Sequence, residues 1–206
     1  MTQVRRYRGV EAAERLAQRR RRFLNAGLDL LGGASDPDDL TVRAICRRAG
    51  LAVRYFYESF SDKDDFAAAV FDWVIADIAA TTQAAVAAAP VQEQNRAGIT
   101  NIVRTIGTDF RTGRLLFDPQ LSNAVLLRKR AELGGVFAIL AGQHVQKALR
   151  SEENSRIKAT AHFVVGGVGQ TISGWLSGDI GLDDEQLVDQ LTAILDELAD
   201  PELYRG

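Results

Sequence analysis

The chain has 206 residues, of which 46% are hydrophobic, 25% charged and 7% aromatic. This composition is typical of a soluble globular protein with a sizeable core, and it excludes disordered and collagen-like chains. We expect no membrane span, because no run approaches the ~18 uncharged apolar residues that a span needs. We expect no signal peptide either, because the N-terminus carries charges where an apolar stretch is required. These features predict a cytoplasmic protein.

The formal net charge of -2 is unevenly distributed along the chain. Residues 1–60 contain twelve Arg and no Lys against seven acidic residues, whereas the remainder contains thirteen basic and twenty acidic residues. A basic N-terminal segment favours binding to a polyanion, and a solvated helix face is the alternative. The single cysteine, Cys46, excludes an intrachain disulfide and a multi-cysteine metal site. We expect neither a metal nor a cofactor.

The N-terminal sixty residues predict three helices, at about 11–31, 42–49 and 53–60. Thr41 is the expected N-cap of the second helix, and Gly50 ends it with a positive φ. Two short helices joined in this way are typical of a helix-turn-helix, which leaves its second helix exposed to a DNA groove. The apolar stripe of the first helix consists of Leu16, Phe23, Gly27, Leu30 and Leu31.

The rest of the chain also shows helical periodicity. A long helix is predicted from Asp62, its expected N-cap, to the Ala-rich stretch before Pro90. Further helices are predicted at about 92–111, 120–150, 154–178 and 183–199. We find no convincing strand, so the predicted fold class is all-α.

The residues around the glycine turn resemble the DNA-binding domain of TetR-type transcriptional regulators. The resemblance covers about residues 19–66, and its most specific part is the sequence AGL followed by Tyr57, Phe60 and Lys63 at fixed spacing. It implies a homodimer in which residues 1–61 form a three-helix DNA-binding domain. Residues 62–206 would form a helical bundle that binds a small ligand and dimerises through its last two long helices.

The same resemblance implies which residues contact double-stranded DNA. Thr41, Tyr57 and Lys63 match phosphate-contacting positions, and Thr41 and Lys63 also lie at predicted helix N-termini, which favour anions. The positions that match base-facing ones are Arg43, Val53, Arg54, Tyr55 and Ser59. Two departures from the family pattern leave the operator sequence open. Ala52 stands where a capping Ser or Thr is usual, and Arg54 and Tyr55 stand where small residues are usual.

Several arginines outside the motif have two interpretations. Arg19 to Arg22 either form a solvated face or bring one or two side chains to phosphate. Arg5, Arg6 and Arg8 precede the predicted first helix and suggest an arm along the duplex. Cys46 is interpreted as a buried, inert thiol rather than a redox sensor.

Candidate ligand-binding residues are the large aromatic residues of the C-terminal part and one histidine. They are Trp73, Phe110, Phe117, Phe137 and His144. Most of these aromatics are equally consistent with ordinary core, and His144 with a core histidine that has its hydrogen-bond partner. A metal-binding role for His144 has no suitably spaced partner.

The glycine-rich run GGVGQTISG fails the dinucleotide-binding pattern at Ile172, which stands where the third glycine would be. As helix residues its glycines cost about 1 kcal/mol each relative to Ala, which the close approach of two helices would offset. We therefore predict a dimer interface from the last two helices. It consists of Val164, Val168, Ile172 and Trp175 with Leu187, Leu191 and Ile194.

Together these features predict a ligand-responsive repressor that binds an inverted-repeat operator and is released by a small apolar or aromatic effector. A constitutive DNA-binding protein without an effector is the first alternative. An enzyme built on a helical bundle is the second, but no nucleophile, base and orienting residue can be assigned to it.

Overall fold

A computed structural model describes residues 4–33, 40–118, 121, 123–134 and 155–198. Every regular element in these segments is a helix, which confirms the all-α prediction. The head of the molecule consists of α1 (Val4–Gly32), α2 (Val42–Ala49) and α3 (Val53–Tyr57). The body begins with α4 (Lys63–Ala88), the short 3-10 helix η2 (Val91–Glu93), α5 (Gln94–Thr108) and α6 (Phe110–Phe117). It continues with a helix over 124–134, α8 (Ser155–Ser177) and α9 (Asp184–Glu197).

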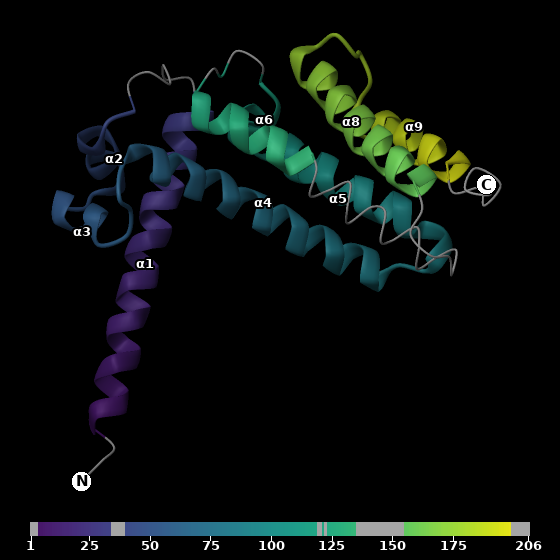
Figure 1. Ribbon diagram of the computed structural model, residues 1–206. Coiled ribbons are helices and arrows are strands. Elements are labelled where there is room, and N and C mark those ends of the chain that lie inside the picture. The colour runs from purple at the N-terminus through teal and green to yellow at the C-terminus, as the bar shows by residue number, and fades with distance from the viewer. Residues whose placement is uncertain (1–3, 34–39, 119–120, 122, 135–154, 199–206) are drawn as a thin grey trace.

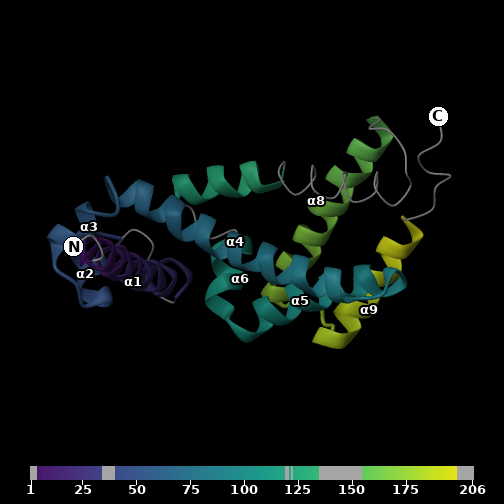
Figure 2. The ribbon, with the colours of Figure 1, turned by 90° about the horizontal axis from the view of Figure 1, so that it is seen from below.

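The head lies at the N-terminal end of α4, and α5 follows the C-terminal end of α4 (Figure 1). In both ribbon views α8 and α9 lie at the end far from α3, where α8 packs against α6 and α9 packs against α5 (Figures 1 and 2). The C-terminal half of α1 packs against α2, α4 and α6, whereas its N-terminal half projects away from the head. The described side chains from residue 12 to residue 18 are accordingly exposed.

Local capping explains why the head folds as predicted. The Thr41 Oγ accepts a hydrogen bond from the Ala44 amide at 3.1 Å, which caps α2. Gly50 ends α2 with φ +63°, the left-handed conformation that favours glycine. Asp62 caps α4 by accepting hydrogen bonds from the amides of Asp64 and Asp65 at 2.9 and 2.8 Å.

A cluster of phenylalanines fastens the three head helices to the start of α4. Phe23 of α1 makes an edge contact with Phe56 of α3, with ring centroids 5.8 Å apart. Phe60 and Phe66 lie 5.0 Å apart at the junction with α4, and all four side chains are buried. The α3 helix and the N-terminus of α4 are therefore packed as one unit.

Three predictions about the head differ from the structure. The first helix begins at Val4, so Arg5, Arg6 and Arg8 belong to a helix instead of an irregular arm before it. Leu16 was placed on the apolar stripe but is 41% exposed, because it lies in the part of α1 that extends beyond the packed head. The third helix ends at Tyr57, earlier than the predicted residue 60.

The predicted helix 92–111 is two helices. The chain leaves helical geometry at Asp109, whose φ and ψ are -132° and 94°, and the Asp109 carboxylate accepts a hydrogen bond from the Arg111 amide at 3.1 Å. Gly113 is buried inside the second of these helices, α6. A Cβ built on Gly113 lies 3.0 Å from Ile106 and Leu176, so the glycine allows close packing there.

The α4 helix bears on the expectation that the chain has no membrane span. It is the one helix in the described ranges that is long and apolar enough to cross a membrane, although Asp72 and Asp77 interrupt its apolar residues. The core helices of soluble proteins pass the same test, and one face of α4 is buried against α1 through Phe66, Val70 and Val74. We therefore interpret α4 as the central helix of the fold.

Candidate DNA-binding site

The α3 helix presents an exposed surface at the end of the head (Figure 1). Its inward residue, Phe56, is fully buried, while Val53 is 43% and Tyr57 is 59% exposed. Arg54 is also exposed. The helix begins after Ala52 without a side-chain cap, as the sequence predicts. This surface carries apolar, cationic and phenolic groups, which are suited to base edges and phosphates in a major groove.

Arg54 and Tyr55 form a cluster with Arg19 of α1. The guanidinium of Arg54 donates a hydrogen bond to the Tyr55 hydroxyl at 2.8 Å. The guanidinium carbons of Arg19 and Arg54 lie 4.4 and 4.7 Å from the centroid of the Tyr55 ring. The hydrogen bond and the positive charge of Arg54 lower the pKa of Tyr55 below its ordinary value, with a smaller contribution from Arg19. Tyr55 is therefore half-buried within the head rather than free to face bases.

Two helix N-termini flank this surface with exposed side chains. Thr41 and Arg43 lie at the start of α2, and Lys63 is the first residue of α4. The unpaired backbone amides of a helix N-terminus attract phosphate, and Thr41 and Lys63 add a hydroxyl and a cation to them. These positions fit the predicted phosphate contacts.

The prediction for Ser59 does not fit the structure. Ser59 lies beyond the end of α3, and its hydroxyl oxygen is buried without a hydrogen-bond partner. Its carbonyl accepts a hydrogen bond from Arg20 at 2.7 Å. Because α3 stops at Tyr57, Ser59 turns inward, and its hydroxyl is not presented to DNA.

Three of the four consecutive arginines in α1 hold the helix-turn-helix in place, a role that neither sequence interpretation included. Arg19 forms an ion pair with Glu58 at 3.4 Å, and Arg20 lies over the Phe60 ring at 4.5 Å. Arg22 donates to the Ala49 carbonyl at 2.8 Å. Helical spacing offered a signal for two of them, because Arg19 and Arg20 lie four and three residues before the buried Phe23, on the same face of α1.

The predicted ligand-binding residues do not form one lining in the described parts of the chain. Trp73 and Phe117 are half-buried and pack against the core that joins head and body. Phe110 is 61% exposed at the start of α6, so its assignment to a cavity is wrong. Phe137 and His144 lie outside the described residues.

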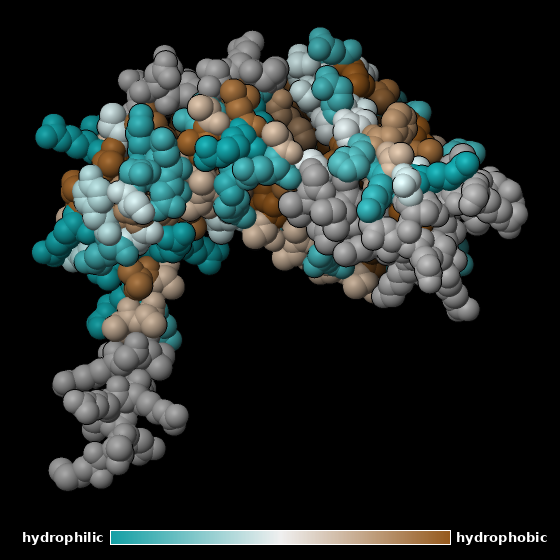
Figure 3. Space-filling view, viewed as in Figure 1, coloured by the Kyte–Doolittle hydropathy of each residue, from teal (hydrophilic) through white to brown (hydrophobic). Residues whose placement is uncertain are grey.

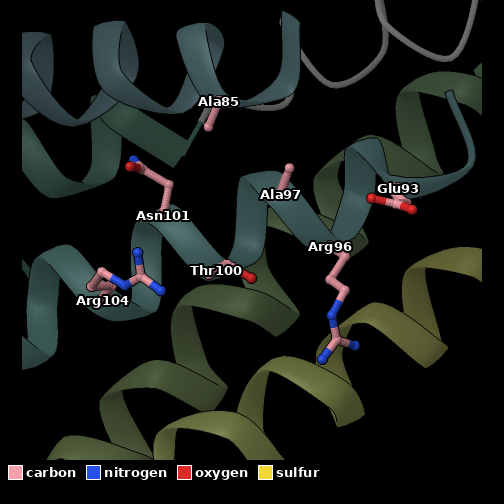
Figure 4. A pocket seen from close by; sticks show the side chains of 7 residues that line it. All are labelled: Ala85, Glu93, Arg96, Ala97, Thr100, Asn101 and Arg104. Atoms are coloured by element: carbon pink, nitrogen blue, oxygen red, sulfur yellow. The ribbon is translucent and has the colours of Figure 1, made fainter. Parts of the chain in front are cut away.

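One groove of about 310 Å³ lies between α4 and α5, and it contains none of the predicted ligand residues (Figure 4). Ala85 projects into it from α4, and the other residues come from α5 and η2. Arg96, at its rim, is held by an ion pair with Asp189 of α9 at 2.6 Å. The lining consists of Ala85, Glu93, Arg96, Ala97, Thr100, Asn101 and Arg104.

Most of the predicted dimer residues belong to the core of the single chain. Leu187 and Leu191 of α9 are buried against Ile99 and Val103 of α5, so their assignment to an interface is wrong. Three more are also turned inward: Ile172 is buried, and Val168 and Trp175 pack against that core. Val164 is half-buried, and Ile194 is 44% exposed.

A different face of the last two helices is open. Phe163 of α8 is 66% exposed, and a Cβ built on Gly166 or Gly167 meets nothing within 4 Å. Figure 3 shows hydrophobic residues interspersed with hydrophilic ones at the α8 end of the molecule, while the surface of the head is mostly hydrophilic. Among the described residues, close packing thus does not explain Gly166 or Gly167, whereas a Cβ built on Gly174 lies 3.2 Å from Ile180.

Other candidate reactive groups lie apart from this surface. Cys46 is buried between the head helices, and burial raises the pKa of its thiol, as expected of an inert cysteine. Within the described ranges no three His, Cys, Asp or Glu side chains gather as a metal site.

The head of the chain matches a known protein family. Residues 24–70 match the family model described as bacterial regulatory proteins of the tetR family. The head of the chain is therefore similar to the N-terminal, DNA-binding part of TetR-type transcriptional regulators. The matched segment runs from the middle of α1 into α4, so it includes the TetR-type helix-turn-helix and its exposed α3.

Solved structures extend the likeness to the whole TetR fold. The fatty acid degradation regulator FadR from Bacillus halodurans is 15% identical, with 86% of this chain and 94% of that chain covered at a TM-score of 0.70. FadR from Bacillus subtilis in complex with stearoyl-CoA is 16% identical, with 84% and 96% covered at a TM-score of 0.63. A TetR-like regulator from Rhodococcus sp. is 17% identical, with 91% and 97% covered at a TM-score of 0.62. The chain matches no curated protein sequence.

Proposed function

We propose that this chain is a homodimeric repressor of the TetR type that binds an inverted-repeat operator and is released by a small apolar effector. The observation that carries the proposal is the exposed α3 surface of Val53, Arg54 and Tyr57 between two helix N-termini. Residues 1–61 act as the DNA-binding part and residues 62–206 as the effector and dimerisation part. The protein works in the cytoplasm, without a membrane, a metal or catalytic activity.

The homodimer places two α3 helices on one face of the duplex. Successive half-sites of B-DNA are about 34–36 Å apart, which a two-fold symmetric pair of heads matches. The open face of α8 with Phe163 and Gly167, together with Ile194 of α9, supports dimerisation at the end far from the heads. Glycines without neighbours inside one chain leave room for the helices of a second copy.

The effector is an apolar molecule with a polar group. The described interior of the body is built from apolar side chains, and apolar pockets with few polar groups are typical of small-molecule sites. A structural neighbour, the Bacillus subtilis FadR, is described in complex with stearoyl-CoA. A series of acyl-CoA esters is therefore the first panel of probes.

The class of function is tested by selecting DNA from a random pool with the purified full chain. An enriched inverted repeat is expected, and a failure to enrich any sequence would contradict the proposal. The Lys63→Ala variant should weaken binding to all sequences and reduce the salt slope by about one per subunit, because one phosphate contact is lost. Lys129→Ala is the matched control, because Lys129 is paired with Asp72 in the body at 2.7 Å.

The two alternatives predict different results. A constitutive DNA-binding protein shows no change in melting temperature with any member of the acyl-CoA panel or of a wider metabolite panel, whereas an effector raises it by mass action. A helical-bundle enzyme would consume a ligand that raises the melting temperature. Recovery of that ligand unchanged after incubation supports regulation.

A further inference from the structure

Arg54 of the recognition helix is held in place before any DNA is bound. It is exposed, and in the part of the chain that the structure describes it pairs with no carboxylate. Its guanidinium instead donates to the Tyr55 hydroxyl at 2.8 Å and lies 4.7 Å from the centroid of the Tyr55 ring. An exposed arginine otherwise samples many rotamers, so these contacts restrict where its charge lies.

Tyr55 is in turn held by a residue outside the recognition helix. The Arg19 guanidinium of α1 lies 4.4 Å from the centroid of the same ring and forms an ion pair with Glu58 at 3.4 Å. The Nε of Arg19 is buried, and the side chain as a whole is 29% exposed, so this guanidinium is partly packed within the head. Arg19 of α1 therefore holds Tyr55, and Tyr55 in turn holds Arg54.

The held arginine keeps its capacity to read a base. A guanidinium has five N–H donors, and one hydrogen bond to Tyr55 leaves four. Guanine presents two acceptors, O6 and N7, in the major groove, and bidentate arginine is its commonest partner. Because Arg54 is fixed beforehand, less conformational freedom is lost on binding.

We propose that Arg54 reads a guanine in each operator half-site, and that Tyr55 and Arg19 are positioning residues that hold Arg54 for this contact. The inference rests on the proposed DNA-binding function. It assigns part of the sequence specificity to Arg19 of α1, which does not itself touch the base, and it replaces a base-facing role for Tyr55 with a supporting one.

The test measures base preference, which a structural role alone would not change at a single position. Wild-type chain first selects its operator from a random pool, and binding to single-base variants of that operator is then compared. Arg54→Ala should lose about 5- to 150-fold of the preference for G·C at one base pair of each half-site. Arg19→Lys keeps the charge but lacks the planar guanidinium. It should lose about 2- to 10-fold of the preference at that same pair, with the salt slope unchanged.

Matched variants separate positioning from charge and from folding. Arg21→Lys is the control, because Arg21 is exposed on the same helix two residues away, and its preference should equal that of the wild type. Tyr55→Phe keeps the ring and removes the hydroxyl, so it should lose part of the same preference. In the Arg54→Ala background, Arg19→Lys should change the preference no further, whereas an unstable head would weaken binding in both backgrounds.

Three results would overturn the inference. One is an Arg54→Ala protein with wild-type base preferences. Another is an Arg19→Lys protein that keeps full preference at the Arg54 pair. The third is a uniform loss of affinity with a shallower salt slope in Arg19→Lys, which would make Arg19 a phosphate contact. If the wild type enriches no sequence at all, the proposed function fails before this inference is reached.

Discussion

Asp29 of α1 and Arg111 of α6 form an ion pair that joins the DNA-binding head to the body. The other carboxylate oxygen of Asp29 binds Arg48 of α2 at 2.7 Å, so one side chain connects three helices. Arg111 also binds Asp109 at 2.6 Å, the residue that separates α5 from α6. The head is therefore attached to the body through α6 as well as through the phenylalanine cluster at the start of α4.

This junction should make the stability of the chain sensitive to acid. The hydrogen bond from Arg111 lowers the pKa of Asp109 below its ordinary value near 3.9. A carboxylate with a lowered pKa contributes stability that is fully present above the unfolded-state pKa and is lost as the pH falls through the folded-state pKa. Asp109→Asn keeps a residue able to cap α6 and removes this contribution.

The measurement is the free energy of unfolding at pH 7 and at pH 3. We expect the wild type to lose more stability between these values than Asp109→Asn does. Equal losses in the two proteins would show that the Asp109 carboxylate contributes no pH-dependent stability.

The close approach of α1 and α6 at Gly32 is a second testable feature of this junction. A Cβ built on Gly32 would overlap the backbone carbonyl oxygen of Arg111, so the two helices would have to move apart. Gly32→Ala should therefore destabilise the chain by about 1–3 kcal/mol, as overpacking does in other cores. The matched control is Gly107→Ala in α5, where the nearest contact is the movable Asp184 carboxylate at 3.3 Å.

We expect Gly107→Ala to leave the free energy of unfolding unchanged or to raise it by up to about 1 kcal/mol, because Ala favours the helix. Denaturant unfolding of both variants measures the difference. A Gly32→Ala protein as stable as Gly107→Ala would show that α1 and α6 are not in close contact.

The parts of the fold that the sequence predicted depend on local chemistry. Thr41, Gly50 and Asp62 act within three residues of their own position, so residue type and spacing are sufficient to place α2 and the start of α4. The exposure of Val53 and Tyr57 follows equally from the buried Phe56 between them. These local rules also predicted the uncapped start of α3.

The parts that were missed depend on contacts between distant segments. Whether Leu187 packs inside the chain or in an interface is decided by α5, and one apolar stripe looks the same in both cases. Arg19 and Arg22 reach residues 27 to 39 positions away, which a run of charges does not indicate. The break at Asp109 was hidden because the apolar pattern continues through it.

The corrected interface gives a prediction about the oligomeric state. Phe163 is 66% exposed on the open face of α8, so Phe163→Asp should leave the single chain folded while placing a charge in the proposed interface. We expect a loss of at least about 100-fold in dimer affinity, equivalent to a few kcal/mol. Phe110→Asp is the matched control, because Phe110 is 61% exposed on α6 and should leave the dimer intact.

Sedimentation equilibrium at several protein concentrations distinguishes these outcomes. Equally stable dimers in both variants would place the interface elsewhere, and a monomeric wild type would remove the homodimer from the proposal. Leu191→Asp is not a suitable probe, because Leu191 is buried within the chain and its substitution unfolds the body.

The last prediction concerns how an effector releases the protein from its operator. Phe60 contacts Phe66 at 5.0 Å, and Arg111 binds Asp29, so movement of α4 or α6 around a ligand must displace the head. Shifting the heads from 99:1 to 1:99 between binding and nonbinding arrangements takes about 5.5 kcal/mol of differential affinity. Linkage requires that the two effects be equal: the operator weakens effector binding by the same factor as the effector weakens operator binding.

This factor is measured by calorimetric titration, with and without operator DNA, of a ligand that raises the melting temperature. Arg111→Ala should reduce it while leaving ligand affinity in the absence of DNA unchanged, because one of the two attachments between head and body is lost. Equal ligand affinities with and without operator in the wild type would show that this ligand is not the releasing signal.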